Sequence, residues 1–261
     1  MTTTQNSTTK KVALITGATA GLGYDIVKRL TKDGYLIVAT ATTKKNCEQI
    51  AVNVQADGLQ DVHAHVLNVT DEESVREVIR YIDQRFGRLD ILINNAGIAL
   101  RVNGKKSLVV DTPLEDWKRT LDTNLTGTFL LSKHAVPLMQ RHQWGRIVNM
   151  SSRAARTRTI LAGSHYAASK AGVIGFSRIL ADEVASSGIT VNCVAPTRIS
   201  TPMAKSVSNP AEMDARFIAA TPVGRLGLPQ DVSAVVSFLV SEEASFLTGI
   251  TIDICGGQFM P

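Results

Sequence analysis

The chain has 261 residues, 44% of them apolar and 20% charged, and a formal net charge of +5. This length and composition fit one large α/β domain or two small ones and exclude a chain too polar to form a core. The charge admits a nucleic-acid partner, but no long basic run with interleaved aromatics supports one, and no apolar run approaches the roughly 20 residues of a membrane span, so we expect neither partner.

The N-terminal segment predicts a tail followed by a nucleotide-binding turn. Residues 1–10 are polar and lack the apolar core of a signal peptide, so we expect a disordered tail. A short strand, Val12–Thr16, then runs into the stretch Thr16-Gly-Ala-Thr-Ala-Gly-Leu-Gly23, and a helix follows. Glycines let the backbone approach a pyrophosphate, and a helix N-terminus offers free N–H groups. An ordinary glycine turn is the alternative, but the position between a strand and a helix favours nucleotide binding.

The end of the second predicted strand bears on the choice of dinucleotide. Leu36–Thr40 is followed by Ala41-Thr-Thr-Lys-Lys45. In a dinucleotide-binding fold this point meets the adenosine ribose, where an acidic residue would hold the 2′-hydroxyl of NAD. Hydroxyls and two lysines stand there instead, which favours NADP and leaves NAD as the alternative. The other interpretation is that Lys44 and Lys45 are exposed loop charges.

Strands and helices continue to alternate along the chain. A third strand, Val62–Leu67, precedes a capping box at Thr70–Glu73 that opens a helix. A fourth strand, Leu89–Asn94, leads through a polar loop to a long helix that Thr112 is expected to cap. Asn124 lies inside that helix, where a short amide is a poor helix former, so it faces either solvent or the cleft.

Three more strands complete the predicted sheet, at Arg146–Ser151, Thr190–Ala195 and Thr251–Ile254. We therefore expect one Rossmann-type, doubly wound parallel sheet of about seven strands with helices on both faces, formed by a single domain at 11–261. The long segment at about 197–228 is expected to be a substrate lid. The cysteines, which are odd in number and far apart, favour a reducing, cytoplasmic compartment, and their spacing does not suggest a metal site.

Tyr166 and Lys170 are four residues apart and therefore share one face of a predicted helix. An ammonium close to a phenol favours the phenolate, which would bring the pKa of Tyr166 toward the range that general acid–base chemistry needs. Ser152 precedes this helix and could hydrogen-bond an oxygen beside the phenol. Tyr-x-x-x-Lys alone is a weak pattern, since most such pairs are an exposed lysine above a half-buried tyrosine.

From about Val12 to Pro261 the chain resembles the short-chain dehydrogenases/reductases. The resemblance rests on motifs in the family's order and near its spacings, namely Thr16-Gly-x-x-x-Gly-x-Gly23, Asn94-Asn-Ala-Gly97, Asn124, Ser152, Tyr166-x-x-x-Lys170 and the segment at Pro196. Several stretches are most similar to the 3-oxoacyl-[acyl-carrier-protein] reductase branch, namely Ala39-Thr-Ala-Thr42, Leu67-Asn-Val-Thr-Asp71, Pro222-x-Gly-Arg-Leu-Gly227 and Gly256-Gly.

The resemblance implies an NAD(P)-dependent oxidoreductase that interconverts a ketone or aldehyde and an alcohol by hydride transfer, and a homotetramer. Tyr166 would protonate the carbonyl oxygen, and Lys170 would lower the pKa of Tyr166 and hold the nicotinamide ribose. Ser152 would polarise the carbonyl, and Asn124 would anchor a water that relays protons to Lys170. The implied cofactor-binding residues are Gly17, Thr19, Ala20, Gly21, Leu22, Gly23, Thr42, Asn68, Val69, Asn95, Ala96, Gly97, Tyr166, Lys170, Pro196, Ile199 and Thr201.

Three arginines, Arg153, Arg156 and Arg158, directly follow Ser152. Guanidinium groups there suit a carboxylate, sulfonate or phosphate, although a solvated loop face is the alternative. We therefore expect NADPH-dependent reduction of a small anionic carbonyl compound, with Ser152, Arg153, Arg158 and Tyr166 at the substrate. The alternatives are a 3-oxoacyl-[acyl-carrier-protein] reductase, an NAD-dependent polyol or sugar dehydrogenase, and a cofactor-binding regulator that has lost its chemistry.

The chain departs from the reductase branch at four places. Ala20 stands where NADP-using relatives often have an arginine, and Thr197 follows Pro196 in place of glycine. The loop after Gly97 is longer and carries three cations that are expected near the cleft mouth, namely Arg101, Lys105 and Lys106. Gln143 and Ser187 stand where reductases that dock an acidic carrier protein have basic residues, which disfavours a carrier-bound substrate.

Overall fold

The computed structural model describes residues 10–260. The tail expected at 1–10 therefore lies outside the described residues except for Lys10, whose Nζ pairs with Asp61 at 2.8 Å. Among the helices within 10–260, none has the length and apolar character needed to cross a bilayer. The three cysteines are buried, and none is in a disulfide.

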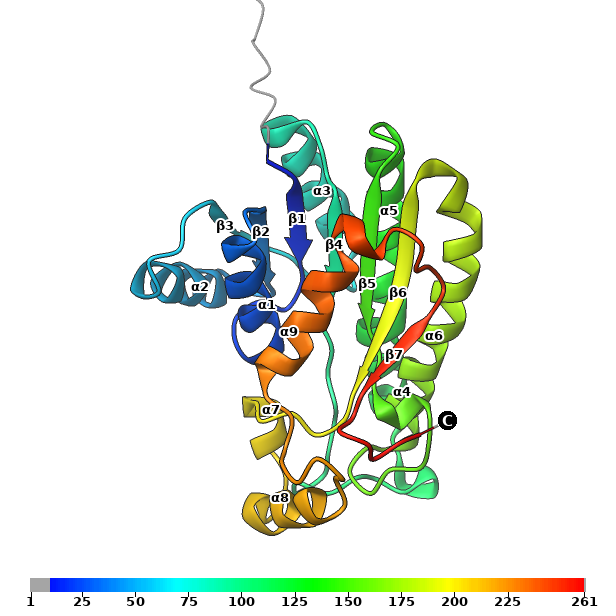
Figure 1. The fold of residues 1–261 in the computed structure, drawn as a ribbon. Coiled ribbons are helices and arrows are strands. Elements are labelled where there is room, and N and C mark those ends of the chain that lie inside the picture. Colours follow the sequence, from blue (N-terminus) through cyan, green and yellow to red (C-terminus); the bar gives the residue numbers. More distant parts are fainter. Residues whose placement is uncertain (1–9, 261) are drawn as a thin grey trace, which may run out of the picture.

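Seven strands form one parallel sheet in the order β3-β2-β1-β4-β5-β6-β7 (Figure 1). This arrangement confirms the expected Rossmann-type doubly wound sheet. The inner strands are buried on both faces, which explains why their sequences are apolar runs rather than alternating patterns. The strands are β1 (Val12–Ile15), β2 (Leu36–Ala41), β3 (Val62–Val66), β4 (Ile91–Asn94), β5 (Gly145–Met150), β6 (Ile189–Pro196) and β7 (Thr251–Ile254).

Helices cover both faces of the sheet, and successive residues of β1 separate the two cores. Val12 and Leu14 pack with apolar side chains of α3, α5 and α6, whereas Ala13 and Ile15 pack with those of α1, α2 and α9. This alternation is the period of two that a strand imposes. The helices are α1 (Gly21–Lys32), α2 (Lys44–Ala56), α3 (Glu72–Phe86), α4 (Leu114–Leu121), α5 (Gly127–Gln140), α6 (Ser164–Val184), α7 (Pro202–Lys205), α8 (Pro210–Ala219) and α9 (Pro229–Leu239).

Three helix starts differ from the sequence predictions. Asp71, not Thr70, caps α3 by accepting from the Glu73 N–H at 3.1 Å. Thr70 instead donates to the Asn68 side chain. The helix α4 begins after Pro113, because the Thr112 hydroxyl donates to the Leu108 carbonyl and closes the preceding turn. The third difference is the start of α2 at Lys44, where no helix was predicted from the sequence.

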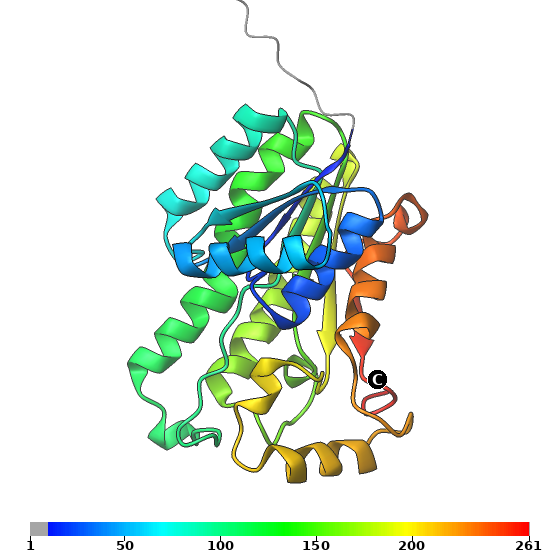
Figure 2. The ribbon, with the colours of Figure 1, turned by 90° about the vertical axis from the view of Figure 1, so that its left-hand side faces the viewer.

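The connections after β1, β4, β5 and β6 all emerge at one end of the sheet, because the strands are parallel. The helices α7 and α8 lie at the same end, below the sheet in Figure 1, and α8 crosses beneath it in Figure 2. Open α/β sheets bind ligands outside the carboxyl ends of their strands. The fold therefore directs attention to this end, where the segment 197–228 lies over the strand ends.

Candidate functional site

The glycine-rich turn after β1 is locked against the end of β4. Gly17 has φ +64°, a conformation that favours glycine, and a Cβ there would lie 2.9 Å from the Ala96 Cα. A Cβ on Gly23 would lie 2.2 Å from the Gly17 carbonyl oxygen. The Asn95 amide donates to the Thr16 and Gly17 carbonyls at 2.8 and 2.9 Å. Backbone contact thus fixes the turn, and a side chain at either glycine would prevent that contact.

The turn opens the twelve-residue helix α1, whose first turn carries neither a side-chain cap nor an acidic residue. Ala20 is the N-cap residue and has no side-chain acceptor, so the first N–H groups of the helix stay available. Free N–H groups at the positive end of a helix dipole form an anion site. Together with the glycine cradle, this arrangement fits the pyrophosphate of a dinucleotide.

A second hollow of about 630 Å³ lies beside this turn, at the ends of β2 and β3. Its lining includes Thr42, Asn68 and Val69, three of the predicted cofactor residues, together with Gly17 and Ala96. At its edge α2 begins with Thr43 as N-cap, and its first turn contains two lysines and no acidic residue. This charge pattern suits the 2′-phosphate of NADP better than the bare hydroxyls of NAD.

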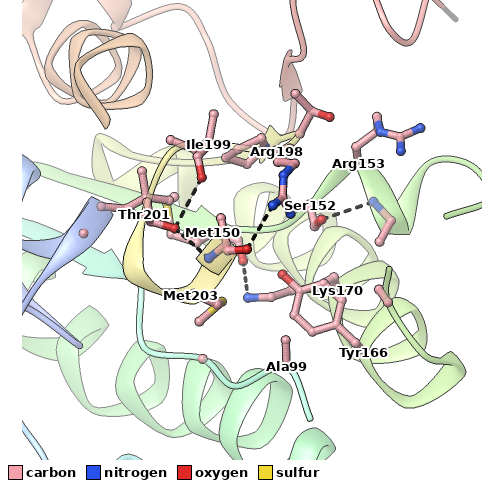
Figure 3. A pocket seen from close by; sticks show the side chains of 18 of the residues that line it. Ala99, Met150, Ser152, Arg153, Tyr166, Lys170, Arg198, Ile199, Thr201 and Met203 are labelled. Carbon is pink, nitrogen blue, oxygen red and sulfur yellow. Dashed lines mark hydrogen bonds between the residues drawn. The ribbon is translucent and has the colours of Figure 1, made fainter. Parts of the chain in front are cut away.

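The main cavity has a volume of about 410 Å³ and continues from the glycine turn to the segment after β6. Most of the predicted site residues line it, as Figure 3 shows for the part around Tyr166. The lining residues that were predicted are Gly17, Ala20, Gly21, Leu22, Gly23, Asn95, Ala96, Gly97, Ser152, Arg153, Tyr166, Lys170, Pro196, Ile199 and Thr201. Of the other predicted residues in the described part of the chain, Thr19, Asn124 and Arg158 line neither hollow.

Ser152, Tyr166 and Lys170 meet in this cavity although they come from two elements. Ser152 follows β5, and the other two lie one turn apart on α6. The Lys170 Nζ is buried, donates to the Met150 carbonyl at 2.6 Å and lies 5.9 Å from the centre of the Tyr166 ring. Burial lowers the pKa of Lys170 to about 8.

The expected pKa of Tyr166 needs a correction. Burial raises the pKa of the Tyr166 phenol above its usual value, against the lowering that the neighbouring lysine predicted. Hydrogen bonding with Ser152 and the charge of Arg101 oppose this rise without cancelling it. Lys170 does not supply the lowering, because its Nζ points to the Met150 carbonyl. The phenol is therefore protonated at neutral pH in this state of the cavity.

Asn124 sits in a π-helical turn, Asp122–Thr126, between α4 and α5. Its side chain is fully buried, accepts from the Ile98 N–H at 2.8 Å and donates to the Ile98 carbonyl and to Ser169. Asn124 thus bonds both the N–H and the carbonyl of Ile98, as a neighbouring strand would do. A Cβ on Gly97 would lie 3.1 Å from the Asn124 amide oxygen and 3.4 Å from the Lys170 Nζ. Asn124 therefore holds the segment at Gly97 and Ile98 in place, and Gly97 forms the cavity wall beside Lys170.

The three arginines after Ser152 have different surroundings. Arg153 lines the cavity and lies over the Phe217 ring, 6.0 Å from its centre. Arg156 is paired with Asp253 at 3.2 Å and stacked on Phe259. Arg158 is exposed and lies outside the lining. The three arginines are close in the sequence but separate in the fold. The short helical turn at 153–155 directs successive side chains to different neighbours.

Two other arginines line the cavity instead. Arg198 follows β6, is buried and forms an ion pair with Asp214 of α8 at 2.5 Å. Arg101 comes from the polar loop after β4. Of these two, only Arg101 was indicated by the sequence, through the extra length and charge of its loop. No local pattern marks Arg198, whose partner lies on a different helix.

Comparisons with known proteins agree with this geometry. A family model described as enoyl-(acyl carrier protein) reductase matches residues 17–258. The 3-oxoacyl-[acyl-carrier-protein] reductase FabG of Haemophilus influenzae is 39% identical over 250 residues, which are 96% of this chain and 98% of that protein. A 3-oxoacyl-[acyl-carrier protein] reductase of Brucella melitensis with bound NAD has a TM-score of 0.88 at 33% identity, covering 98% and 93% of the two chains. An actinorhodin polyketide ketoreductase with NADPH has a TM-score of 0.88 at 32% identity, covering 98% and 99%.

Proposed function

This chain belongs to the short-chain dehydrogenase/reductase family, and from that premise we propose that it reduces a small carbonyl compound to an alcohol, with Tyr166 as the proton donor. The protein is an NAD(P)-dependent oxidoreductase that acts on carbonyl and hydroxyl carbons of a small-molecule substrate. The observation that carries the proposal is the convergence of Ser152, Tyr166 and Lys170 in one cavity whose wall also contains the glycine turn. NADPH, when bound, supplies a hydride to the carbonyl carbon.

Tyr166 acts as the acid in this proposal because its phenol is protonated at neutral pH. A raised pKa keeps the proton on the oxygen until charge develops on the substrate carbonyl. The Ser152 oxygen accepts from the Ala154 N–H at 3.2 Å, and its own hydrogen, which serves the Tyr166 oxygen in this structure, would be donated to the same carbonyl oxygen when substrate binds. Two donors then stabilise the oxygen as it becomes negative, in the manner of an oxyanion site.

Lys170 and Asn124 act on the proton donor rather than on the carbonyl. With a pKa of about 8, Lys170 is mostly charged at neutral pH and would turn from the Met150 carbonyl to give a proton to the phenolate that proton transfer leaves behind. Asn124 holds the loop at Ile98 and thereby the wall beside the Lys170 Nζ. Once Lys170 has given its proton to the phenolate, a water held near Asn124 would supply a new proton to the neutral Lys170 and complete the relay.

A 3-oxoacyl-[acyl-carrier-protein] reductase is the second candidate, and the similarity to enzymes of that name favours it. Gln143 and Ser187 supply no basic pair for an acidic carrier. The absence of this basic pair favours a free small molecule over a carrier-bound one.

The proposal includes a homotetramer formed through α5 and α6. Small residues on α6, among them Ala168 and Gly175, allow close approach of a second helix, and no described atom lies within 4 Å of a Cβ built on Gly175. Phe129 and Ile179 expose 44% and 64% of their surface on these two helices, which is unusual for side chains of this size. Light scattering should give four times the mass of the chain, and Ile179→Glu should lower it.

An absorbance assay of dinucleotide consumption against a panel of ketones, aldehydes and alcohols tests the function. We expect NADPH to be oxidised with at least one small carbonyl compound, and Tyr166→Phe to reduce kcat by about 10²- to 10⁴-fold. NADPH binding by the variant, followed by fluorescence, should stay unchanged because the cofactor cradle is backbone. Retained turnover in Tyr166→Phe would contradict the proposed role of the phenol.

A further inference from the structure

The residues within 10–260 that line the main cavity include four cations and no carboxylate. Arg101, Arg153, Lys170 and Arg198 contribute to its wall, and none of the described residues that line it is Asp or Glu. The cavity therefore carries a positive potential, and its apolar walls keep water from screening that potential fully. In the view of Figure 3, Ser152 lies between the Tyr166–Lys170 pair and the two arginines that the figure labels.

Two of these cations already have an ion-pair or hydrogen-bond partner within the protein. Arg198 is neutralised by Asp214 and also donates to the Ala204 carbonyl at 3.0 Å. Lys170 donates to Met150 and belongs to the proton-transfer group. Arg153 contacts the Phe217 ring, and among the described residues it has no carboxylate partner. The positive charge that remains for a ligand is thus that of Arg101 and Arg153.

Of these two arginines, Arg101 is the one with a buried donor that has no acceptor in the described part of the chain. Among the described residues its one hydrogen bond runs from Nη1 to the Ser206 hydroxyl at 3.0 Å. Its Nε is buried and has no hydrogen-bond partner. A buried, charged donor without an acceptor is unfavourable, and the Nε edge of a guanidinium matches the two oxygens of a carboxylate or sulfonate. Because the Nε atom is itself covered, the guanidinium would have to turn toward the cavity for an anion to bind this edge and remove that penalty.

The loop that carries Arg101 is held in place on two sides. Val102 and Lys105 pair through two backbone hydrogen bonds of 3.0 and 2.9 Å around a tight turn at 103–104. The Ser208 N–H donates to the Gly104 carbonyl, which connects the turn to the segment between α7 and α8. The Lys106 Nζ donates to the Thr159 carbonyl across the cavity mouth. Arg101 is therefore presented by a fixed turn rather than by a free loop.

Arg101 and the Tyr166 phenol lie in one cavity, which limits the length of a ligand that contacts both. Arg101 and Tyr166 line the same cavity, and the charge of Arg101 acts on the pKa of Tyr166. Coulomb interactions of this kind in a protein are effective over several ångströms. Both side chains line one cavity of about 410 Å³, so one small molecule in it can meet both.

We propose that Arg101, assisted by Arg153, binds a carboxylate or sulfonate group of the substrate, so that the enzyme selects short carbonyl compounds carrying an anionic group near the carbonyl. This inference rests on the proposed function and adds the class of substrate. It differs from the sequence expectation, because Arg158 is outside the cavity and Arg156 is held by Asp253. It also disfavours an acyl thioester, which is neutral beside its carbonyl.

Binding to the protein saturated with NADP⁺ tests the inference without turnover. The probes are acetoacetate, levulinate and 2-oxopropane-1-sulfonate, with the methyl esters of the two acids as neutral counterparts, titrated by calorimetry. We expect at least one anion to bind about tenfold more tightly than its neutral counterpart. Equal affinity for every acid and its ester, or no binding of any anion, would overturn the inference.

Two charge-removing variants in the same loop localise the effect. Arg101→Gln should weaken binding of the preferred anion at least about tenfold and leave the ester unchanged. Lys105→Gln removes the same charge from an exposed position outside the cavity lining and should change neither. Arg101→Lys, which keeps the charge but not the fork, should fall between wild type and Arg101→Gln. Equal losses in Arg101→Gln and Lys105→Gln would indicate general surface charge and overturn the inference.

Steady-state reduction of the same probes with NADPH separates this inference from the proposed function. If the wild type reduces esters and acids with equal kcat/KM, the carbonyl reductase function stands and the anion site is wrong. If anions bind through Arg101 but no probe is reduced, the site stands and the proposed reduction is wrong. Thermal unfolding of Arg101→Gln checks that the loss of the Ser206 contact has not unfolded the loop.

Discussion

The dinucleotide end and the carbonyl end of the cavity are built in different ways. At the dinucleotide end the backbone provides the site, through Gly17, Gly23 and the first N–H groups of α1. At the carbonyl end side chains do so, and they come from three connecting segments that lie far apart in the sequence, as Arg101, Arg153 and Arg198 show. Lys170 lies in the wall between the two ends.

This difference predicts which substitutions each end of the cavity can tolerate. A backbone site depends on close approach, so one added methyl group disturbs it, while its surface charges are of little consequence. A side-chain site depends on which charges are paired, so removing one cation changes specificity while the fold remains. Four substitutions test this distinction, and they follow from the largest expected effect to the smallest.

Gly23→Ala should have the largest effect, because its Cβ would lie 2.2 Å from the Gly17 carbonyl oxygen and 2.6 Å from the Asn95 amide. Backbone cannot move aside as a flexible side chain can, so we expect a loss of about 3 kcal/mol or more in the free energy of unfolding. Binding of NADPH should fall with it. Denaturant unfolding and a fluorescence titration measure the two quantities.

Gly175→Ala is the matched control for Gly23→Ala. Both glycines are helical, but no described atom lies within 4 Å of a Cβ at Gly175. The change should be neutral or stabilise the monomer by up to about 1 kcal/mol through helix propensity. Light scattering of the variant should check that the proposed pairing of α6 is kept. If both alanine variants behave alike, close approach at the turn is not what defines the dinucleotide end.

Lys170→Met tests the residue between the two ends through the pH dependence of stability. Burial lowers the pKa of Lys170 to about 8 in the folded protein, against about 10.4 in an unfolded chain. Between these values the unfolded state binds more protons, so the contribution of Lys170 to stability rises with pH, and below pH 8 the buried charge costs roughly 3 kcal/mol. The variant loses the hydrogen bond to Met150, about 1 kcal/mol, and should gain roughly 2 kcal/mol at pH 7.

That gain should shrink as the pH rises above 8, because wild-type Lys170 then folds uncharged. Urea unfolding of the ligand-free protein at pH 7 and pH 9.5 measures the difference. Lys205→Met, at an exposed position, should stay within about 0.5 kcal/mol of wild type at both pH values. A pH-independent gain in Lys170→Met would show that burial does not lower the pKa of Lys170, because stability changes with pH only where the folded and unfolded states bind different numbers of protons.

The contrast between the two ends also explains which parts of the site could be predicted from the sequence. The turn at Gly17–Gly23 and the Tyr166–Lys170 pair were predicted because each is a local pattern whose physical requirement is fixed by spacing along one element. The arginines could not be assigned in this way. Arg156 and Arg158 look equivalent to Arg153 in the sequence, and only the fold shows that Asp253 holds the first and that solvent surrounds the second.

Three other misses have separate physical causes. The burial that raises the pKa of Tyr166 comes from the assembled cavity, which the helix that carries it does not reveal. The start of α3 was displaced by one residue because Asn68, at the end of β3, engages Thr70. The helix α2 was missed because its amphipathic pattern is weak, with only Cys47 and Ile50 buried.

Lys44→Gln should have a smaller effect than Lys170→Met and act on one dinucleotide only. Lys44 is exposed in the first turn of α2, next to the hollow lined by Thr42. An exposed charge contributes up to about 1 kcal/mol, so affinity for NADPH should fall by up to roughly fivefold and affinity for NADH should not change. Titrations of both dinucleotides measure this ratio. Equal losses for the two would place Lys44 away from the 2′-phosphate.

Arg158→Gln should have the smallest effect, although the sequence places Arg158 among the candidate substrate residues. The side chain is exposed and outside the cavity lining, so we expect the free energy of unfolding to stay within about 0.5 kcal/mol of wild type. The kcat/KM for an anionic carbonyl substrate should stay unchanged, whereas Arg153→Gln in the same loop should lower it. A loss in Arg158→Gln as large as that in Arg153→Gln would require the 153–163 loop to close over the ligand. The carbonyl end would then be assembled by binding, in contrast to the dinucleotide end, which the backbone forms in advance.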